Sequence, residues 1–379
     1  MPQPPWSIIV PLLAALTQVA VAQVVHHVGP GNHPTIQAAI TVAAPGDIIE
    51  VAAGVYPSFH VGKALTIAAE PSALVQIIST GPLTVTLQPF DRVFLGGLDI
   101  QVSAITITGG IVAAERCTVH TDTGMQLVNG VALLRWCAAG AAAASGILVQ
   151  DGHLYASDST FSTTAGGAND FEYGAVHCRG VGTCNLALCS LIGAWPATPA
   201  APWPSAALHV TEANVVERVW VVDCTLNGGL LSNGMEGPSV TAPALPTLPP
   251  VRIYRSQLTG PAFGAISFGR ILGVHTPVDM AIGSTFTTTM HGEPGHPFLF
   301  YVGTDVFGPV QIPEVDQPAF GFINTLIFPI VYADSLGNAQ FSFPVPNIPT
   351  LRHFPLWWRG LDLISVPWQA TPPFVTIIQ

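Results

Sequence analysis

Two carboxylates in the middle of the chain are the residues best placed to do chemistry. Asp151 follows Gln150 in VQDGHLY, and Asp170 lies 19 residues later in DFEYG. If the chain repeats with about this period, the two side chains can lie on adjacent strands, about 4.8 Å apart. Carboxylates this close have pKa values that are pushed apart, so one can stay protonated as an acid while the other attacks. Arg270, in SFGRILG, is a candidate to orient them.

The elements that must position these carboxylates are the units of a sequence repeat. Each unit has alternating strand-like residues, then a Cys or Ser anchor, an apolar residue and usually a Gly. The anchors are Cys117, Cys137, Ser159, Cys189, Cys224, Ser256 and Ser284, with steps of 20, 22, 30, 35, 32 and 28 residues. Repetition at this scale is typical of stacked architectures, in which one unit cannot bury its apolar face alone. Because the units resemble strands, the repeat predicts a β-solenoid.

Composition agrees with many short strands. Hydrophobic residues make up 49% of the chain and charged residues 9%, with 37 Gly and 35 Pro spread along it. After the N-terminus no apolar run reaches the length of a membrane-spanning helix, which excludes an ordinary helical membrane protein. The net charge is −11 and Lys63 is the single lysine, so a nucleic acid is not an expected partner.

The N-terminal segment indicates export. Residues 7–22 form an apolar stretch that ends in Ala20-Val21-Ala22, a pattern typical of signal-peptide cleavage. We therefore expect residues 1–22 to be a signal peptide and the mature chain to begin near Gln23. This predicts a secreted or cell-envelope protein with no membrane span after processing.

Residues 35–70 predict a capped first turn of the solenoid. TIQAAITVA has helical periodicity with Thr35 as a candidate N-cap, and three strand-like segments follow: IIEVAAG, VYPSFHV and KALTIAAE. This segment resembles the start of the pectin-lyase-like right-handed parallel β-helices, which include pectin methylesterases and NosD-like repeat proteins. The resemblance implies an all-β fold, a right-handed single-stranded parallel β-helix with an N-terminal capping helix, over residues 23–290.

The resemblance to pectin methylesterases also implies roles for the carboxylates. Gln150 would stabilise an oxyanion, Asp151 would act as acid and base, Asp170 would be the nucleophile and Arg270 would hold it. Two departures stand against this assignment: Ser58 replaces a Glu in GVYPS, and Glu172 replaces an apolar residue in DFEYG. The segment VQDGHLYASDSTF also fits the ordinary repeat, with Asp151 in a turn.

A polysaccharide lyase is a further possibility. Such enzymes use clustered carboxylates to hold calcium, and this chain offers scattered acidic residues without a recognisable loop. The acidic balance of the chain opposes binding of polyuronates. Calcium is the one cofactor that these acidic residues make possible, and we expect no other cofactor.

Three insertions lengthen the later repeats, over residues 165–174, 194–205 and 232–251. They all follow the anchor strand, so they should leave from one corner of the solenoid and line up along it. The insertions carry side chains suited to sugars, in which aromatic rings stack on the apolar faces of pyranoses beside acidic groups. The candidate binding residues are Phe171, Glu172, Tyr173, Trp195 and Trp203, with Asp170 and Glu236 beside them. The alternative is that these Pro-rich loops only shield the flank.

The cysteines and histidines offer other chemistry. We expect the anchor cysteines to be small interior residues of a ladder. Cys178 and Cys184, in HCRGVGTC, can form a short disulfide in an oxidising compartment, or bind zinc together with His177. His26 and His27 can bind a metal near the mature N-terminus.

The last 80 or so residues change character. Residues 291–379 lack the anchor phrase and alternate strand-like runs with Pro turns, which predicts a separate antiparallel β-sandwich. It loosely resembles the C-terminal β-domains of secreted bacterial proteins. Trp357, Trp358 and Trp368 are expected in its core.

These observations favour a non-catalytic protein that presents an extended surface to a polysaccharide or a cell-surface protein. The alternative is a carbohydrate-active enzyme, pectin-esterase-like or a polysaccharide lyase. A fold by itself supports either one, because function depends on the site that the fold carries.

Overall fold

The protein is described by a computed structural model, and its fold is nearly all-β. The structure describes residues 23–163, 174–180, 182–193, 205–211, 216–229, 236–242, 251–264, 266–268, 273–275, 280–303, 305–310, 319–323, 325–348, 355–364, 368–371 and 374–378. The chain divides into two compact units, and the boundary lies between Gly269 and Arg270.

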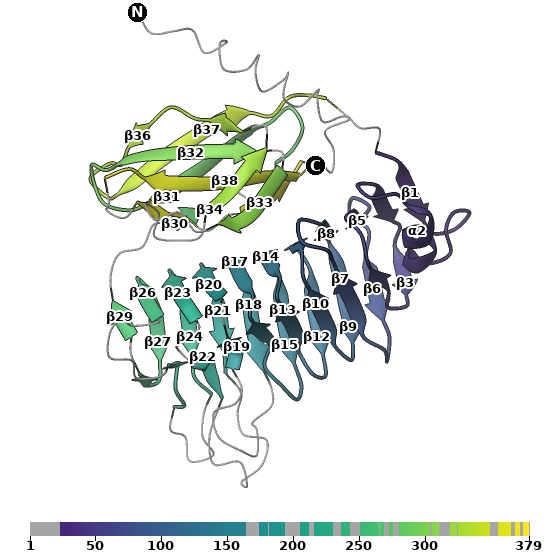
Figure 1. Ribbon diagram of the computed structural model, residues 1–379, viewed down its shortest axis with the longest axis horizontal. Helices are drawn as coiled ribbons and strands as arrows, with labels where there is room; N and C mark the ends of the chain where they lie inside the picture. The colour runs from purple at the N-terminus through teal and green to yellow at the C-terminus, as the bar shows by residue number, and fades with distance from the viewer. Residues whose placement is uncertain are drawn as a thin grey trace, which may run out of the picture. The chain divides into compact units, whose positions relative to one another are not determined.

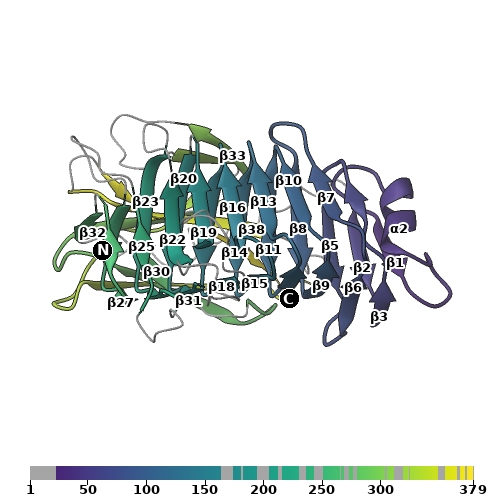
Figure 2. The same cartoon turned by 90° about the horizontal axis from the view of Figure 1, so that it is seen from below.

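The first unit is a parallel β-helix of three sheets, which the chain visits in the order A, B, C on each rung (Figures 1 and 2). Sheet A contains β1 (Val25–Val28), β2 (Ile48–Val51), β5 (Leu65–Ala69), β8 (Arg92–Gly96), β11 (Ile111–Glu115), β14 (Val131–Arg135), β17 (His153–Ser157), β20 (Gly182–Ala187), β23 (Val216–Val222), β26 (Val251–Tyr254) and β29 (Ile266–Phe268).

The other two sheets have nine strands each. Sheet B contains β3 (Gly54–Tyr56), β6 (Val75–Ile78), β9 (Leu98–Val102), β12 (Thr118–Thr121), β15 (Ala138–Ala141), β18 (Thr160–Thr163), β21 (Ser190–Ile192), β24 (Thr225–Asn227) and β27 (Gln257–Thr259). Sheet C contains β4 (His60–Val61), β7 (Leu83–Thr86), β10 (Ile105–Thr108), β13 (Met125–Val128), β16 (Ile147–Gln150), β19 (Gly174–Arg179), β22 (Ala206–Thr211), β25 (Val240–Thr241) and β28 (Ala262–Phe263).

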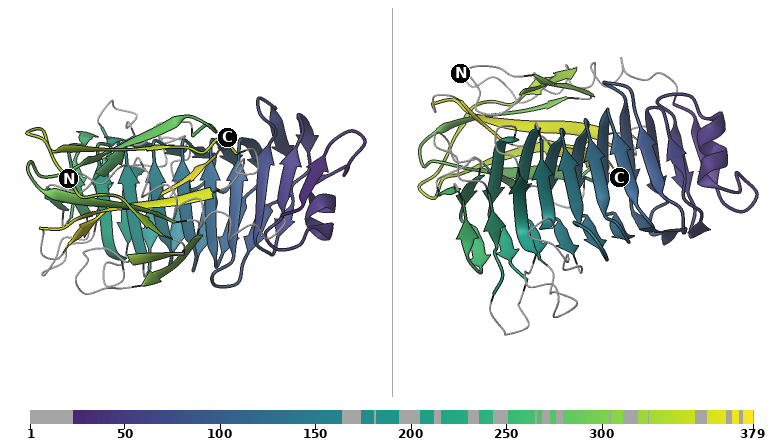
Figure 3. Two further views of the ribbon diagram at one scale, coloured as in Figure 1. Left: turned by 90° about the horizontal axis from the view of Figure 1, so that it is seen from above. Right: turned by 60° about the horizontal axis from the view of Figure 1, so that its bottom comes forward.

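Matching registers place like residues above one another along the stack. In sheet C, Ile107 pairs with Leu127 and Leu127 with Val149, and all three side chains are buried in the core. Because side chains alternate between the two faces of a strand, the residues between them point outward. The interior side chains of successive rungs therefore form continuous rows. The right part of Figure 3 shows the stacked strands that carry them.

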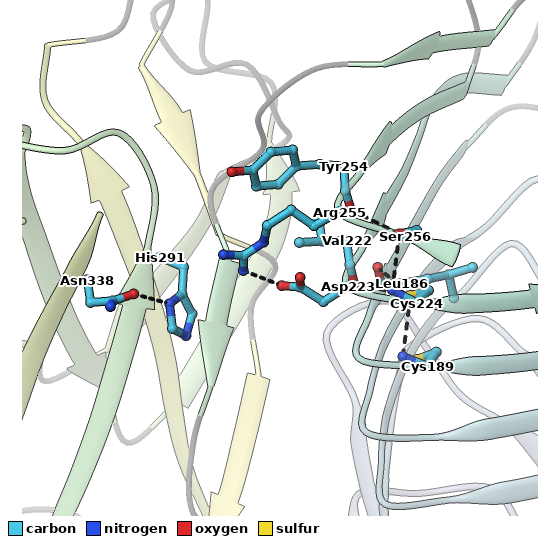
Figure 4. A network of polar contacts seen from close by, with 10 residues as sticks. All are labelled: Leu186, Cys189, Val222, Asp223, Cys224, Tyr254, Arg255, Ser256, His291 and Asn338. Carbon is cyan, nitrogen blue, oxygen red and sulfur yellow. Dashed lines mark hydrogen bonds and ion pairs between the residues drawn. The ribbon is translucent and has the colours of Figure 1, made fainter. Parts of the chain in front are cut away.

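The anchor residues form one such row, as the repeat predicted. Their hydrogen bonds link one rung to the next: Cys137 N–H donates to Ser159 Oγ (3.1 Å), Cys189 N–H to Cys224 Sγ (3.3 Å) and Cys224 N–H to Ser256 Oγ (3.0 Å). Figure 4 shows the last two contacts. Cys224 Sγ also lies 3.1 Å from the carbonyl oxygen of Val222, two residues earlier. A small side chain that can both donate and accept a hydrogen bond is needed here, which explains why both Cys and Ser occur at this position.

Each anchor follows a corner residue in the left-handed backbone region. The corner between sheets A and B has positive φ at Gly97, Arg116, Trp136, Asp158, Leu188, Asp223 and Arg255. This conformation turns the chain sharply between two strands, at a cost of about 1–2 kcal/mol for a residue with a Cβ. The hydrogen bonds between the anchor residues of successive rungs offset this conformational cost.

A short helix caps the N-terminal end of the stack, as expected. Helix α2 (Ile36–Val42) begins at Thr35, whose side chain accepts a hydrogen bond from the Ala38 N–H (3.1 Å), and it buries Ile36 and Ile40 (Figure 2). Asp47 joins this cap to strand β1. Its carboxylate accepts bonds from the N–H groups of Val24 and Ala44 and contacts His26 (3.0 Å).

The second unit is antiparallel. Its strands are β30 (Gly273–His275), β31 (Thr285–His291), β32 (Pro297–Gly303), β33 (Asp305–Val310), β34 (Ala319–Ile323), β35 (Leu326–Ile327), β36 (Val331–Tyr332), β37 (Asn338–Pro344), β38 (Pro355–Asp362), β39 (Gln369–Ala370) and β40 (Phe374–Ile377). The β30-β31-β37 sheet packs on the sheet built around β32 and β38 through buried rings, with Phe286 stacked on Trp358 at 5.0 Å. This packing is the expected β-sandwich.

Three expectations for this region need correction. Ser284 is not a solenoid anchor, because it directly precedes the antiparallel strand β31, which belongs to the second unit. The boundary expected at residue 290 falls inside β31, which pairs with β37, so it lies within the second unit. Trp357 and Trp358 are buried as expected, whereas Trp368 is 42% exposed.

Candidate functional site

Gln150 and Asp151 end a strand of sheet C and turn the chain toward sheet A. Gln150 is the last residue of β16 and is partly exposed on the outer face. Asp151 has φ 52° and its N–H donates to the carbonyl of Arg179 on the next rung (3.1 Å). The turn interpretation of VQDG is therefore correct at the level of the backbone. Asp170 and Arg270 lie outside the described residues.

The residues around Gln150 come from the neighbouring rungs. Gln150 pairs in register with Arg179 of β19, which in turn pairs with Thr211 of β22. The Asp151 side chain lies against Gly180 of the next rung. A residue with a Cβ at position 180 would clash with the Asp151 carboxylate. The sequence prediction named Arg270, which lies outside the described residues, and did not name Arg179. The signal was present, since RG in HCRGVG occupies the same place in its rung as QD in VQDG.

The first two insertions connect sheet B with sheet C, as predicted: the first joins β18 to β19 and the second joins β21 to β22. The third range, 232–251, contains β25 of sheet C and reaches the first residue of β26 in sheet A, so it does not fall at a single corner. Asp151 belongs to the opposite end of the sheet C strands, where the chain turns into sheet A. Phe171, Glu172, Tyr173, Trp195 and Trp203 lie outside the described residues, and Glu236, beside β25, is exposed.

Two histidines lie against each other with tilted rings on the outer face of sheet C. His177 of β19 and His209 of β22 are register partners, and their ring centroids are 4.7 Å apart. His177 Nε2 lies 3.0 Å from Thr211 Oγ1, and His209 Nδ1 lies 2.5 Å from Thr241 Oγ1. Burial lowers the pKa of His209 to about 4. This ring is therefore neutral at pH 7 and is a weak base, because an effective general base has a pKa near the working pH.

Histidine–threonine pairs recur elsewhere on the β-helix. His60 Nδ1 lies 2.8 Å from Thr84 Oγ1 in sheet C, and His153 Nδ1 lies 2.9 Å from Thr183 Oγ1 in sheet A. Each pair joins register partners on successive rungs, as His209 and Thr241 do. A contact that occurs on two sheets at separated rungs is a cross-strand pairing device. This recurrence indicates that the His209–Thr241 pair is a structural contact and not a nucleophile with its base.

Sheet B presents an almost uncharged polar surface on its outer face. One row along the stack consists of Gln76, Asp99, Thr118, Ala138, Thr160, Ser190, Thr225 and Gln257. The parallel row consists of Ile78, Gln101, His120, Gly140, Ser162, Ile192, Asn227 and Thr259. We call these two rows the sheet B face. Asp99 and His120 are its only ionisable residues, and the amide groups of Gln76 and Gln101 donate to Asp99 Oδ2.

The cysteine chemistry considered from sequence does not occur. All six cysteines are free and buried. Cys178 and Cys184 lie in the interior of the β-helix, whereas His177 is on the outer face, so these three cannot bind one zinc ion. Burial raises the pKa of Cys189 well above its usual range, so this thiol stays protonated as a hydrogen-bond donor.

One group among the described residues has the composition of a metal site. The ligand atoms of His27, Glu50 and Glu70 lie within 4.8 Å of one another. His27 was singled out in the sequence, and its two carboxylate neighbours were not, because they lie 23 and 43 residues further along the chain. The described residues contain no helix with the length and apolar character needed to cross a bilayer.

Comparison of the chain with protein-family models, with curated proteins and with solved structures finds no match in any of the three. The fold and the surfaces described above are therefore the basis for any assignment.

Proposed function

We propose that this chain is a non-catalytic, exported β-helix protein that binds a polysaccharide along the sheet B face. The observation that carries the proposal is this face itself, which extends over eight rungs with hydroxyl and amide side chains and almost no charge. Neutral glycans present rows of hydroxyl groups, and such a surface offers them donors and acceptors at the regular spacing of strands, about 4.8 Å.

The position of the insertions supports the same surface. The first two insertions follow strands β18 and β21 of sheet B in the sequence, and they carry the aromatic residues. Aromatic rings supply apolar contact at low cost in conformational entropy, and a polar face supplies orientation. The net charge of −11 favours a neutral or basic glycan over a polyuronate. Export rests on the N-terminal signal-peptide pattern.

The direct test is binding to a glycan array, followed by affinity measurements on the glycans that bind. A triple variant, Thr160→Ala with Ser190→Ala and Thr225→Ala, removes three consecutive hydroxyls from the sheet B face. We expect affinity to fall at least about tenfold, which corresponds to the loss of about 1.4 kcal/mol across three hydrogen bonds. Thr86→Ala with Thr108→Ala is the matched control, because these threonines point outward from neighbouring strands of sheet C.

Equal losses in the triple variant and the control would contradict the proposal. Absence of any glycan binding, together with capture of a defined cell-surface protein by the sheet B face, would replace the polysaccharide with a protein partner.

A carbohydrate-active enzyme is the second candidate, and the resemblance to pectin-lyase-like proteins supports it. In that case Asp170→Asn should abolish turnover of methylated pectin while glycan affinity is kept. Arg179→Gln adds a test of the register neighbour of Gln150, and it should lower turnover if this end of sheet C holds the reacting groups. Lack of turnover in the unmodified protein would exclude the esterase.

A further inference from the structure

The first strands of sheet A bring three metal-binding side chains together on one outer face. His27 of β1 pairs in register with Glu50 of β2, and Glu50 pairs with Ala68 of β5. Glu70 follows β5, and its N–H donates to the carbonyl of Val51 (2.9 Å). Because alternate residues of a strand share a face, Glu70 points to the same side as Ala68. Because the Ala68 side chain is small, the carboxylates of Glu50 and Glu70 can approach each other on this face.

The distances are close to those that a bound metal requires. His27 Nδ1 lies 3.2 Å from Glu50 Oε2, and the ligand atoms of all three residues lie within 4.8 Å of one another. Zinc bonds of 2.0–2.2 Å place two ligands of a tetrahedral ion roughly 3.4 Å apart. The His27–Glu50 separation already matches this value, and small side-chain rotations bring Glu70 to it.

The group contains more carboxylates than the neighbouring ion pair of His26 with Asp47. At Asp47, one carboxylate contacts His26 and also accepts two backbone N–H bonds, so its lone pairs are used within the fold. At His27, two carboxylates converge on one imidazole, and their mutual repulsion is relieved by a divalent cation. The His27 ring is half-exposed, so an ion can reach it from solvent.

We propose that His27, Glu50 and Glu70 bind a first-row divalent transition metal, with zinc as the reference ion. One nitrogen and two carboxylate ligands leave a fourth position for water, and an imidazole ligand favours such metals over calcium, which takes oxygen ligands. The ion ties strand β1, whose partner among the described strands is β2, to the end of β5. The metal therefore fastens the N-terminal edge of the β-helix.

Zinc titration of the full chain after EDTA treatment tests this site by calorimetry. We expect one zinc ion per chain and a higher melting temperature with zinc. His27→Gln, Glu50→Gln and Glu70→Gln should each weaken binding at least about tenfold, since even the loss of an outer-shell partner costs about 10–100-fold. His120→Gln, which removes an exposed histidine of the sheet B face, is the matched control and should bind zinc as the unmodified protein does.

Cobalt gives a second readout, because tetrahedral or five-coordinate cobalt absorbs visible light strongly and the three variants should lose this absorption. Melting curves in EDTA confirm that each variant still folds. The proposal is wrong if the full chain binds no zinc at 100 μM added metal, if binding is the same in all three variants, or if calcium binds as tightly as zinc.

Discussion

At the scale of single residues, the row of anchor residues shows why cysteine and serine can replace each other inside this protein. Both side chains are small, and both can donate a hydrogen bond and accept one. Cys224 Sγ accepts from the Cys189 N–H and lies within reach of the Val222 carbonyl oxygen. The residue therefore satisfies backbone groups at the corner of a rung, where the strand ladder is interrupted.

A pair of substitutions at Cys224 tests this role. Cys224→Ser should change the free energy of unfolding by about 1 kcal/mol or less, because the hydroxyl repeats both interactions. Cys224→Val has a similar volume but leaves the buried Cys189 N–H without an acceptor, which should cost about 1–3 kcal/mol. Urea unfolding measures both. Equal losses in the two variants would show that volume, not hydrogen bonding, decides which residues fit.

His209 predicts a pH dependence of stability. Burial lowers its folded pKa to about 4, below the value of about 6.5 in an unfolded chain. Between these values the unfolded state binds more protons, so stability falls as the pH falls, by up to about 1.4 kcal/mol per pH unit for this group. His209→Gln should flatten urea midpoints measured from pH 7 to pH 4, and the exposed His120→Gln should not. Parallel profiles for His209→Gln and the unmodified protein would contradict this.

At the scale of elements, the cap shows how one carboxylate can organise several segments. Asp47 receives the N–H groups of Val24, before β1, and of Ala44, after α2. Burial opposes its ionisation, but the bonds from His26, Ala44 and Val24 together lower the pKa of this carboxyl. An ionised Asp47 thus holds the helix and the edge strand on the first rung.

Asp47→Ala should destabilise the protein by about 1–3 kcal/mol, because two backbone N–H groups lose their acceptor. Its folded pKa is lowered, so the stabilisation is present above the unfolded value of about 3.9 and is lost as the pH falls through the folded pKa. The difference between variant and unmodified protein should therefore shrink at the acid end of a pH series of urea midpoints. Val42→Ala, at an exposed position near the end of the helix, is a suitable control. A difference that persists unchanged to the lowest pH would contradict the role of the ionised group.

At the scale of the whole molecule, each unit has its own hydrophobic core. The core of the β-helix runs from Val28 to Ile253 without a break, since every rung contributes residues to the same interior. In such a stack each rung is stabilised mainly by its two neighbours. The core of the second unit is built from rings that pack around Trp358.

A substitution in the middle of the β-helix core tests this continuity. Leu127→Ala removes a fully buried side chain and should cost about 2–5 kcal/mol. Ile192→Ala, at an exposed position of the sheet B face, should change stability by less than about 0.5 kcal/mol. Chemical unfolding followed by circular dichroism measures both. A loss below about 0.5 kcal/mol for Leu127→Ala would show that the rung can collapse around the missing side chain.

Local pattern and repeat phase alone determined that this chain forms a solenoid of short strands with a helical cap, and that the anchor cysteines face inward. These features follow from side-chain alternation and from recurrence of the anchor at one place in each rung, both of which are local. The tertiary structure decided which distant residues meet. The contact of His177 with His209 and the meeting of His27 with Glu50 and Glu70 depend on register between rungs. Register depends on how many residues each corner and insertion consumes, and this number varies from rung to rung, so the sequence pattern could not predict it.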